Sequence, residues 1–238
     1  DGSSWTEVGD MNTGRANMGG AGTATAALCF TGSDQPGSHV AVSEEWNGTS
    51  WTEGNDVQAA RREIGGTGIQ TAALCIAGNY APQPRSANVE YYNGTSWSEG
   101  ANLNAAKSNL GAAGVNASAI AFAGSTPNLV TAEVYDGSSW SEVNDLNTGR
   151  NNLGGAGATG TAAIAIGGGD DDGAKANTES YDGSSWTEVA DLNTAFKGIP
   201  GQGTSVLAMT QGGDNPGPAT AITEEWSFSA SVETIAFD

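Results

Sequence analysis

The chain has 238 residues and a formal net charge of −19, from 8 Lys and Arg against 27 Asp and Glu. Phosphate binding needs clustered basic residues, so this balance excludes nucleic acid as a partner and disfavours an anionic membrane surface. Glycine supplies 36 residues, about twice its usual share, and no apolar run approaches the roughly 18 residues of a membrane span, so no membrane insertion is expected.

One short motif recurs along the whole chain. Asp/Asn-Gly-Ser/Thr-Ser-Trp occurs five times, with spacings of 46, 46, 43 and 46 residues between Trp5, Trp51, Trp97, Trp140 and Trp186. An aromatic residue stands five positions before each of the last four tryptophans, and another follows near the end: Trp46, Tyr92, Tyr135, Tyr181 and Trp226. A fixed period of this length is typical of repeat architectures such as propellers.

Each unit contains four predicted strands. In the fourth unit the first two are the small-residue segment 153–157 and the apolar segment 162–166. A loop leads to a third strand at 177–181, and Asp182-Gly183, a strong hairpin signal, turns the chain into a fourth strand at 186–189. Four short strands in every 43–46 residues predict a propeller blade.

The sequence therefore predicts an all-β fold, a single five-bladed β-propeller of four-stranded antiparallel blades over residues 1–238. An N-terminal strand within residues 1–10 is expected to complete the last blade and so remove an open sheet edge. The blades are expected at about 11–54, 57–100, 103–143, 146–189, and 192–226 plus 1–8. The segment 227–238 is a tail, and its strand-like part 231–237 is the alternative candidate for the closing position.

The units resemble Kelch repeats. Glycine after the second strand, Tyr in the third strand, a Trp five residues later and a basic residue before the next blade match at Gly168, Tyr181 and Trp186, and at Gly124, Tyr135, Trp140 and Arg150. The resemblance implies a propeller and leaves the function open, because such propellers host both enzymes and binding modules. The repeat motif Asn-Gly-Thr-Ser-Trp-Thr-Glu also resembles repeats in proteins of marine phages and environmental bacteria.

Four basic residues share the position just before a first strand, and polar residues stand two positions later. Donors near a mouth of the central channel would suit an anionic or hydroxyl-rich ligand. The candidate ligand-binding residues are Arg15, Asn17, Arg61, Glu63, Lys107, Asn109, Arg150 and Asn152. In the alternative interpretation, each basic side chain bonds backbone carbonyls or a carboxylate of a neighbouring blade, a role that the Kelch resemblance implies.

Acidic residues recur in two patterns. Asp170, Asp171 and Asp172 stand between glycines in a loop and can supply oxygen ligands for Ca²⁺, the one cofactor that the sequence suggests. Glutamates also occupy one position of every third strand and one of every fourth strand: Glu44, Glu90, Glu133, Glu179 and Glu224, and Glu7, Glu53, Glu99, Glu142 and Glu188. These ten carboxylates occupy equivalent positions in the repeated units. They are therefore not expected to form the pair of carboxylates in different environments that a glycosidase needs.

Nucleophilic and redox chemistry find little support. His39 is the single histidine, so a cluster of histidines around a metal and a His-assisted triad are not expected. The two cysteines are predicted to be small buried core residues. They share a second-strand position with three alanines: Cys29, Cys75, Ala121, Ala165 and Ala208.

These observations predict a propeller without enzymatic activity, a binding or structural protein displayed on a virus particle or a cell exterior. Its expected partners are glycans or protein surfaces, bound at several repeated shallow sites of modest single-site affinity. The alternative is a glycoside hydrolase or lyase that acts on polysaccharide. That alternative needs non-repeated acids to converge on one mouth of the channel: Glu63, Asp170, Asp171, Asp172 and Asp214.

Overall fold

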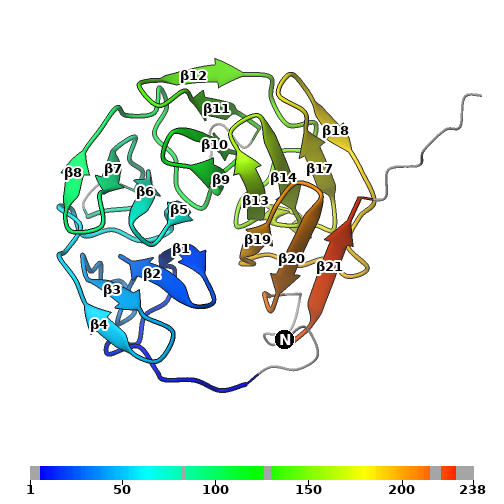
Figure 1. Cartoon of the computed structure of the whole chain (residues 1–238). Helices are drawn as coiled ribbons and strands as arrows, with labels where there is room; N and C mark the ends of the chain where they lie inside the picture. The colour runs from blue at the N-terminus through cyan, green and yellow to red at the C-terminus, as the bar shows by residue number, and fades with distance from the viewer. Residues whose placement is uncertain (1–5, 82–83, 126–129, 215–220, 229–238) are drawn as a thin grey trace, which may run out of the picture.

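The computed structural model describes residues 6–81, 84–125, 130–214 and 221–228. Within these ranges the chain forms β-strands and no helix, so none of the described segments is a helix that could cross a membrane. Apart from one small two-stranded hairpin, the described strands form five antiparallel sheets that stand around a common centre, with the first strand of each of the five innermost (Figure 1). The structure confirms the all-β, five-bladed propeller.

Successive strands of a blade are neighbours in its sheet. Blade 1 consists of β1 (Gly19–Thr23), β2 (Ala26–Phe30), β3 (Ser43–Trp46) and β4 (Trp51–Glu53). Blade 2 consists of β5 (Gly65–Ile69), β6 (Ala72–Ile76), β7 (Val89–Tyr92) and β8 (Trp97–Glu99). Blade 3 consists of β9 (Gly111–Val115), β10 (Ser118–Phe122), β11 (Ala132–Tyr135) and β12 (Trp140–Val143). Blade 4 consists of β13 (Gly154–Thr159), β14 (Ala162–Ile166), β17 (Thr178–Tyr181) and β18 (Trp186–Glu188), with a separate hairpin of β15 (Gly169–Asp170) and β16 (Gly173–Ala174). The described strands of blade 5 are β19 (Gly201–Gly203), β20 (Leu207–Gln211) and β21 (Thr223–Ser227).

The repeat motif is the turn between the third and fourth strands. Tyr181 pairs with Trp186 across a turn of four residues. The side-chain oxygen of Asp182 accepts backbone N–H bonds from Ser184 and Ser185, both at 2.8 Å. Asp or Asn therefore begins the motif because its side chain stabilises the turn.

The recurring tryptophans of β8, β12 and β18 pack between blades. Trp186 of β18 packs against Phe122 of the preceding blade, with ring centroids 5.0 Å apart, and Tyr181 of its own blade lies at 5.1 Å. Trp97 and Phe30 repeat the contact between blades 2 and 1 at 4.8 Å. Each of these fourth strands thus fastens its blade to the blade before it.

Glycine allows the inner strands to approach closely. A Cβ atom at Gly155 in β13 would lie 2.5 Å from the carbonyl oxygen and 2.8 Å from the nitrogen of Ala112 in β9. Gly155→Ala is therefore expected to push blades 3 and 4 apart and to lower the free energy of unfolding by about 1–3 kcal/mol. Gly14→Ala is the matched control, because nothing lies within 4 Å of its added Cβ. Equal unfolding midpoints of the two variants in urea would contradict this packing.

The closing strand is not confirmed in the structure. The sheet of blade 5 has three strands among the described residues, and residues 6–8 run exposed outside any sheet. Trp5 and the alternative closing segment 231–237 lie outside the described residues. Inner strands of successive blades contact one another from β1 through β5, β9 and β13 to β19, whereas β19 and β1 do not meet in this way. The outer edge of β21 has no strand beside it among the described residues.

Candidate functional site

The four basic residues predicted near the channel lie inside the blades. Each has a side chain at most 1% exposed and is paired with the third-strand glutamate of its own blade. The nitrogen–oxygen distances are 3.0 Å for Arg15–Glu44, 3.0 Å for Arg61–Glu90, 3.9 Å for Lys107–Glu133 and 2.6 Å for Arg150–Glu179. The four side chains are thus bound inside the protein, as in the alternative interpretation, but the carboxylate belongs to the same blade and not to a neighbouring one. Their charged groups are buried and do not face a ligand at the mouth.

The buried glutamates are saturated with donors. In blade 4, Glu179 accepts the backbone N–H groups of Asn147 at 2.7 Å and Thr148 at 3.2 Å, and the Asn147 side-chain amide at 2.9 Å. These donors belong to the linker that enters the blade, so each carboxylate joins linker, cation and third strand. A carboxylate held in this way is a structural group and has no lone pair directed at a substrate.

Blade 5 departs from this pattern. Phe196, which is 1% exposed, takes the place of the basic residue. Its glutamate, Glu224, is half-buried and keeps the linker bonds, from the Asn193 N–H at 2.8 Å and the Thr194 N–H at 3.2 Å. Blade 5 therefore provides a natural comparison without the cation.

The polar residues two positions later do lie at the mouth. We call Asn17, Glu63, Asn109, Asn152 and Gly198 the mouth ring. Their φ angles, between 53° and 69°, are all left-handed. The backbone N–H groups of the last four members each donate to the carbonyl of the preceding member, at 2.9 Å for Glu63, 2.8 Å for Asn109, 2.9 Å for Asn152 and 2.7 Å for Gly198. This chain of hydrogen bonds holds the side chains in fixed positions.

The mouth ring opens into the central channel. The inner strands line a cavity of about 750 Å³, and all five ring residues contribute to its lining. Most of the remaining lining is glycine and alanine, so the inner wall exposes backbone rather than large side chains. Asn17 and Gly198 are exposed, and the other three members of the ring are half-buried. The channel mouth is thus the place where fixed polar side chains meet an accessible cavity.

Glu63 is the centre of a polar network in the mouth ring. Its Oε2 accepts from the Asn109 side chain at 3.2 Å and the Asn79 side chain at 3.4 Å, and its Oε1 lies 3.4 Å from Arg62 Nε. Asn109 also donates to the Ser125 hydroxyl at 3.1 Å. Arg62 and Glu63 keep about a fifth of their side-chain surface exposed, so both charged groups can reach a ligand.

Three members of this network were not found from the sequence. The residues before a first strand pair with the loop after a second strand, as in the bridge between Arg62 and Asn79. The three residues that were missed lie in such paired segments: Arg62, Asn79 and Ser125. His39 joins the network through Asn79, with the two side chains 3.1 Å apart. The sequence did carry a signal for two of them, because Asn79 and Ser125 each directly follow the glycine that comes after a second strand.

The acidic loop forms the hairpin of β15 and β16. Asp170 pairs with Lys175 at 3.0 Å and accepts the N–H of Asp172 at 2.9 Å. The hydrogen bond from Lys175 lowers the pKa of Asp170 below its usual value. Asp171 and Asp172 are exposed. The described part of the chain holds no group of three acidic, His or Cys side chains arranged around a metal position, and Ca²⁺ binding stays a prediction.

The cysteines differ in environment. Cys75 is fully buried, its sulfur accepts from Arg61 at 3.1 and 3.3 Å, and burial raises its pKa to about 11. Cys29 is half-buried and contributes to the lining of the central cavity. The register corrects the alignment in blade 5, because Thr210, and not Ala208, pairs with the third-strand glutamate there.

No protein-family model matches the chain, and a search of curated proteins finds no match to it.

Proposed function

We propose that this chain is a non-catalytic binding propeller of the Kelch type that takes a hydroxyl-rich ligand, a glycan, at the channel mouth. The observation that carries the proposal is the network around Glu63, where amide, carboxylate, guanidinium and hydroxyl groups lie on a run of backbone bonds that extends from Asn17 to Gly198. Such groups recognise sugar hydroxyls, which both donate and accept hydrogen bonds. Preorganisation reduces the entropy lost on binding.

The proposal includes display on a virus particle or a cell exterior. Support comes from the resemblance of the repeat motif to repeats in proteins of marine phages and environmental bacteria, and from the strongly acidic composition. Asparagine at three positions of the mouth ring supplies similar contacts around the channel. A protein of this kind holds a surface by many weak contacts, so assembly into a multivalent particle raises the avidity.

An enzymatic role has weaker support. The third-strand carboxylates of blades 1–4 are buried and bonded to cations and linker amides, which leaves Glu63 as the ionisable acid within the mouth network. A glycosidase needs two carboxylates with different roles at a defined separation. Turnover of any polysaccharide by the purified chain would favour the alternative of a hydrolase or lyase.

Glu63→Asn tests the binding site. The variant places at position 63 the residue that three other mouth-ring positions already carry in the same left-handed conformation. We expect its stability to change by at most about 1 kcal/mol, while the affinity for a glycan found on an array falls about tenfold, because a charged hydrogen bond is lost.

Asp171→Asn is the matched control. It removes the same charge from the exposed β15–β16 hairpin of blade 4 and is expected to leave glycan affinity unchanged. Isothermal titration of both variants with the array hit gives the comparison. Equal affinities for the wild-type chain and Glu63→Asn would remove the mouth from consideration as the binding site.

A further inference from the structure

The unused hydrogen-bonding groups of the mouth ring are mainly acceptors. The side-chain amide of Asn109 donates to Glu63 at 3.2 Å and to Ser125 at 3.1 Å, so both of its N–H groups are occupied. Its Oδ1 accepts no hydrogen bond from the described residues. The amide of Asn152 donates in the same way to Asn151, at 2.7 Å. The ring therefore spends donors on its own network and leaves side-chain oxygen atoms for a ligand.

Glu63 adds a charged acceptor. Its Oε2 accepts from Asn79 and Asn109, whereas its Oε1 lies 3.4 Å from Arg62 Nε. That nitrogen makes no hydrogen bond within the described part of the chain, so Oε1 has an ionic neighbour there but no bonded donor. The Glu63 side chain is 19% exposed and lines the central cavity. A ligand in the cavity can thus bond to Oε1.

The donors around Glu63 are directed by the chemistry of the carboxylate. A carboxylate only accepts hydrogen bonds, so Asn79 turns its Nδ2 toward Glu63 and its Oδ1 toward His39. His39 Nε2 lies 3.1 Å from that oxygen and therefore carries a proton. Asn79 and His39 thus use these donors within the network and do not offer them to a ligand.

The cavity presents a negative charge. Arg15 and Glu63 are the two charged side chains among its described lining residues. The Arg15 side chain is 0% exposed and paired with Glu44, so its charge is balanced inside blade 1. Arg62 contacts Glu63 but does not line the cavity. Because the whole chain has a net charge of −19, a cation is attracted to this cavity and an anion is repelled.

We propose, resting on the proposed glycan-binding function, that the mouth ring binds a primary ammonium group and that the glycan is therefore an amino sugar with a free amine. An ammonium group carries three donors, one positive charge and no acceptor. It therefore matches the unused oxygen atoms of Glu63 and Asn109. The cavity of about 750 Å³ lies within the range of roughly 300–1,000 Å³ that is typical of small-molecule sites.

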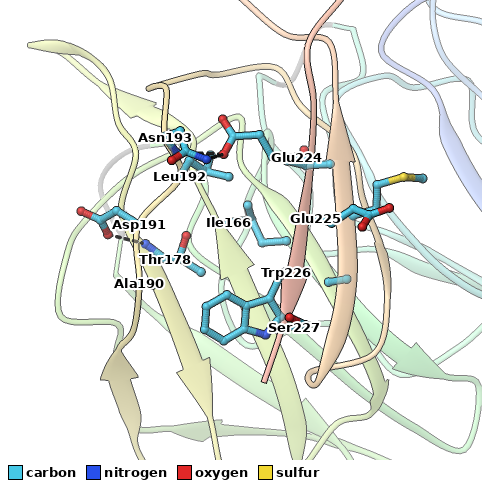
Figure 2. Close-up of a pocket in the computed structure, with 13 residues that line it drawn as sticks. Ile166, Thr178, Ala190, Asp191, Leu192, Asn193, Glu224, Glu225, Trp226 and Ser227 are labelled. Carbon is cyan, nitrogen blue, oxygen red and sulfur yellow. Dashed lines mark hydrogen bonds between the residues drawn. The ribbon is translucent and has the colours of Figure 1, made fainter. Parts of the chain in front are cut away.

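A second cavity, of about 230 Å³, lies between blades 4 and 5 and provides a control. Figure 2 shows Ile166, Leu192 and Trp226 among the residues that line it, together with the glutamates Glu224 and Glu225. Glu225 is exposed. Glu225→Gln therefore makes the same chemical change as Glu63→Gln, in a cavity outside the mouth ring.

The test measures, by isothermal titration, the affinity of the full chain for a short glucosamine oligomer and for its N-acetylated counterpart. Acetylation removes the positive charge and keeps the ring hydroxyls. Below the pKa of its amines, the free-amine oligomer is expected to bind the wild-type chain at least about tenfold more tightly, because it makes a charged hydrogen bond. Glu63→Gln is expected to abolish this preference, and Glu225→Gln is expected to keep it.

Arg62→Gln is expected to change the affinity in the opposite direction. The Arg62 guanidinium lies beside the carboxylate that holds the amine, so its removal is expected to raise the affinity for the free-amine oligomer about two- to threefold. Weaker binding to Arg62→Gln and tighter binding to Glu63→Gln would show a ligand that carries an anion and would overturn the proposal. Both side chains are partly exposed, so both variants are expected to fold.

Three further results would contradict the proposal in different ways. Equal affinities of the wild-type chain for the two oligomers, both weakened by Glu63→Gln, would overturn the free amine and leave the glycan-binding function intact. A preference for the free amine that survives Glu63→Gln would overturn the placement of the amine at the mouth. Spermidine is an amine without a sugar, and binding as tight as that of the free-amine oligomer would overturn the amino sugar and the glycan-binding function together.

Discussion

Glu179→Ala is expected to lower the free energy of unfolding by about 3–5 kcal/mol, because it leaves the Arg150 guanidinium charged and unpaired in the interior. Arg150 is fully buried and lies 2.6 Å from Glu179. The substitution also removes the acceptor for the N–H groups of Asn147 and Thr148. Denaturant unfolding followed by tryptophan fluorescence measures the loss.

Glu224→Ala is the matched control, because blade 5 has Phe196 in place of the cation. Glu224 is half-buried and bonds only linker amides among the described residues, so its removal is expected to cost about 1 kcal/mol. Equal losses for the two variants would mean that the buried ion pairs do not stabilise the blades.

Trp186→Ala is expected to lower the free energy of unfolding by a similar amount, about 3–5 kcal/mol. Its indole is 5% exposed and packs between Phe122 and Tyr181 at the junction of blades 3 and 4. Truncation leaves a cavity at the place where two sheets are joined. The measurement is the same unfolding titration, read by circular dichroism because the variant lacks one fluorophore.

Trp186→Phe separates packing from hydrogen bonding. The indole nitrogen of Trp186 has no hydrogen-bond partner among the described residues, so phenylalanine loses only part of the contact area. We expect a loss of about 1 kcal/mol for this variant. If phenylalanine were as destabilising as alanine, the contact with Phe122 would not explain the stability of this junction.

The blades were predictable because each is local in the chain. A third strand expected at 177–181 is observed at Thr178–Tyr181, and the second strand expected at 162–166 is observed as Ala162–Ile166. The second strand follows from a short apolar run that ends in glycines, and the third strand from its place just before the Asp-Gly hairpin signal. The unit of 43 rather than 46 residues still forms a four-stranded blade, blade 3, because loops tolerate changes of length.

The candidate site was predictable only in part. Asparagine is enriched among residues with left-handed φ, so its repeated use in the mouth ring was a usable signal, whereas Glu63 carries no such signal. Whether the Arg150 side chain faces the channel mouth or the interior of the blade depends on its contact with Glu179, 29 positions away. The sequence left both possibilities open. The junction of blades 5 and 1 depends on the two ends of the chain, and local patterns do not determine how distant segments meet.

Hydrogen–deuterium exchange of the chain with and without a bound glycan tests the central claim most directly. Binding at the channel mouth predicts slower exchange of the ring amides, above all those of Glu63 and Asn109, which donate to neighbouring carbonyls at 2.9 and 2.8 Å. The exposed outer strands β8 and β12 are expected to exchange at the same rate in both states. Protection confined to the outer strands, with no change in the mouth ring, would contradict the proposed site.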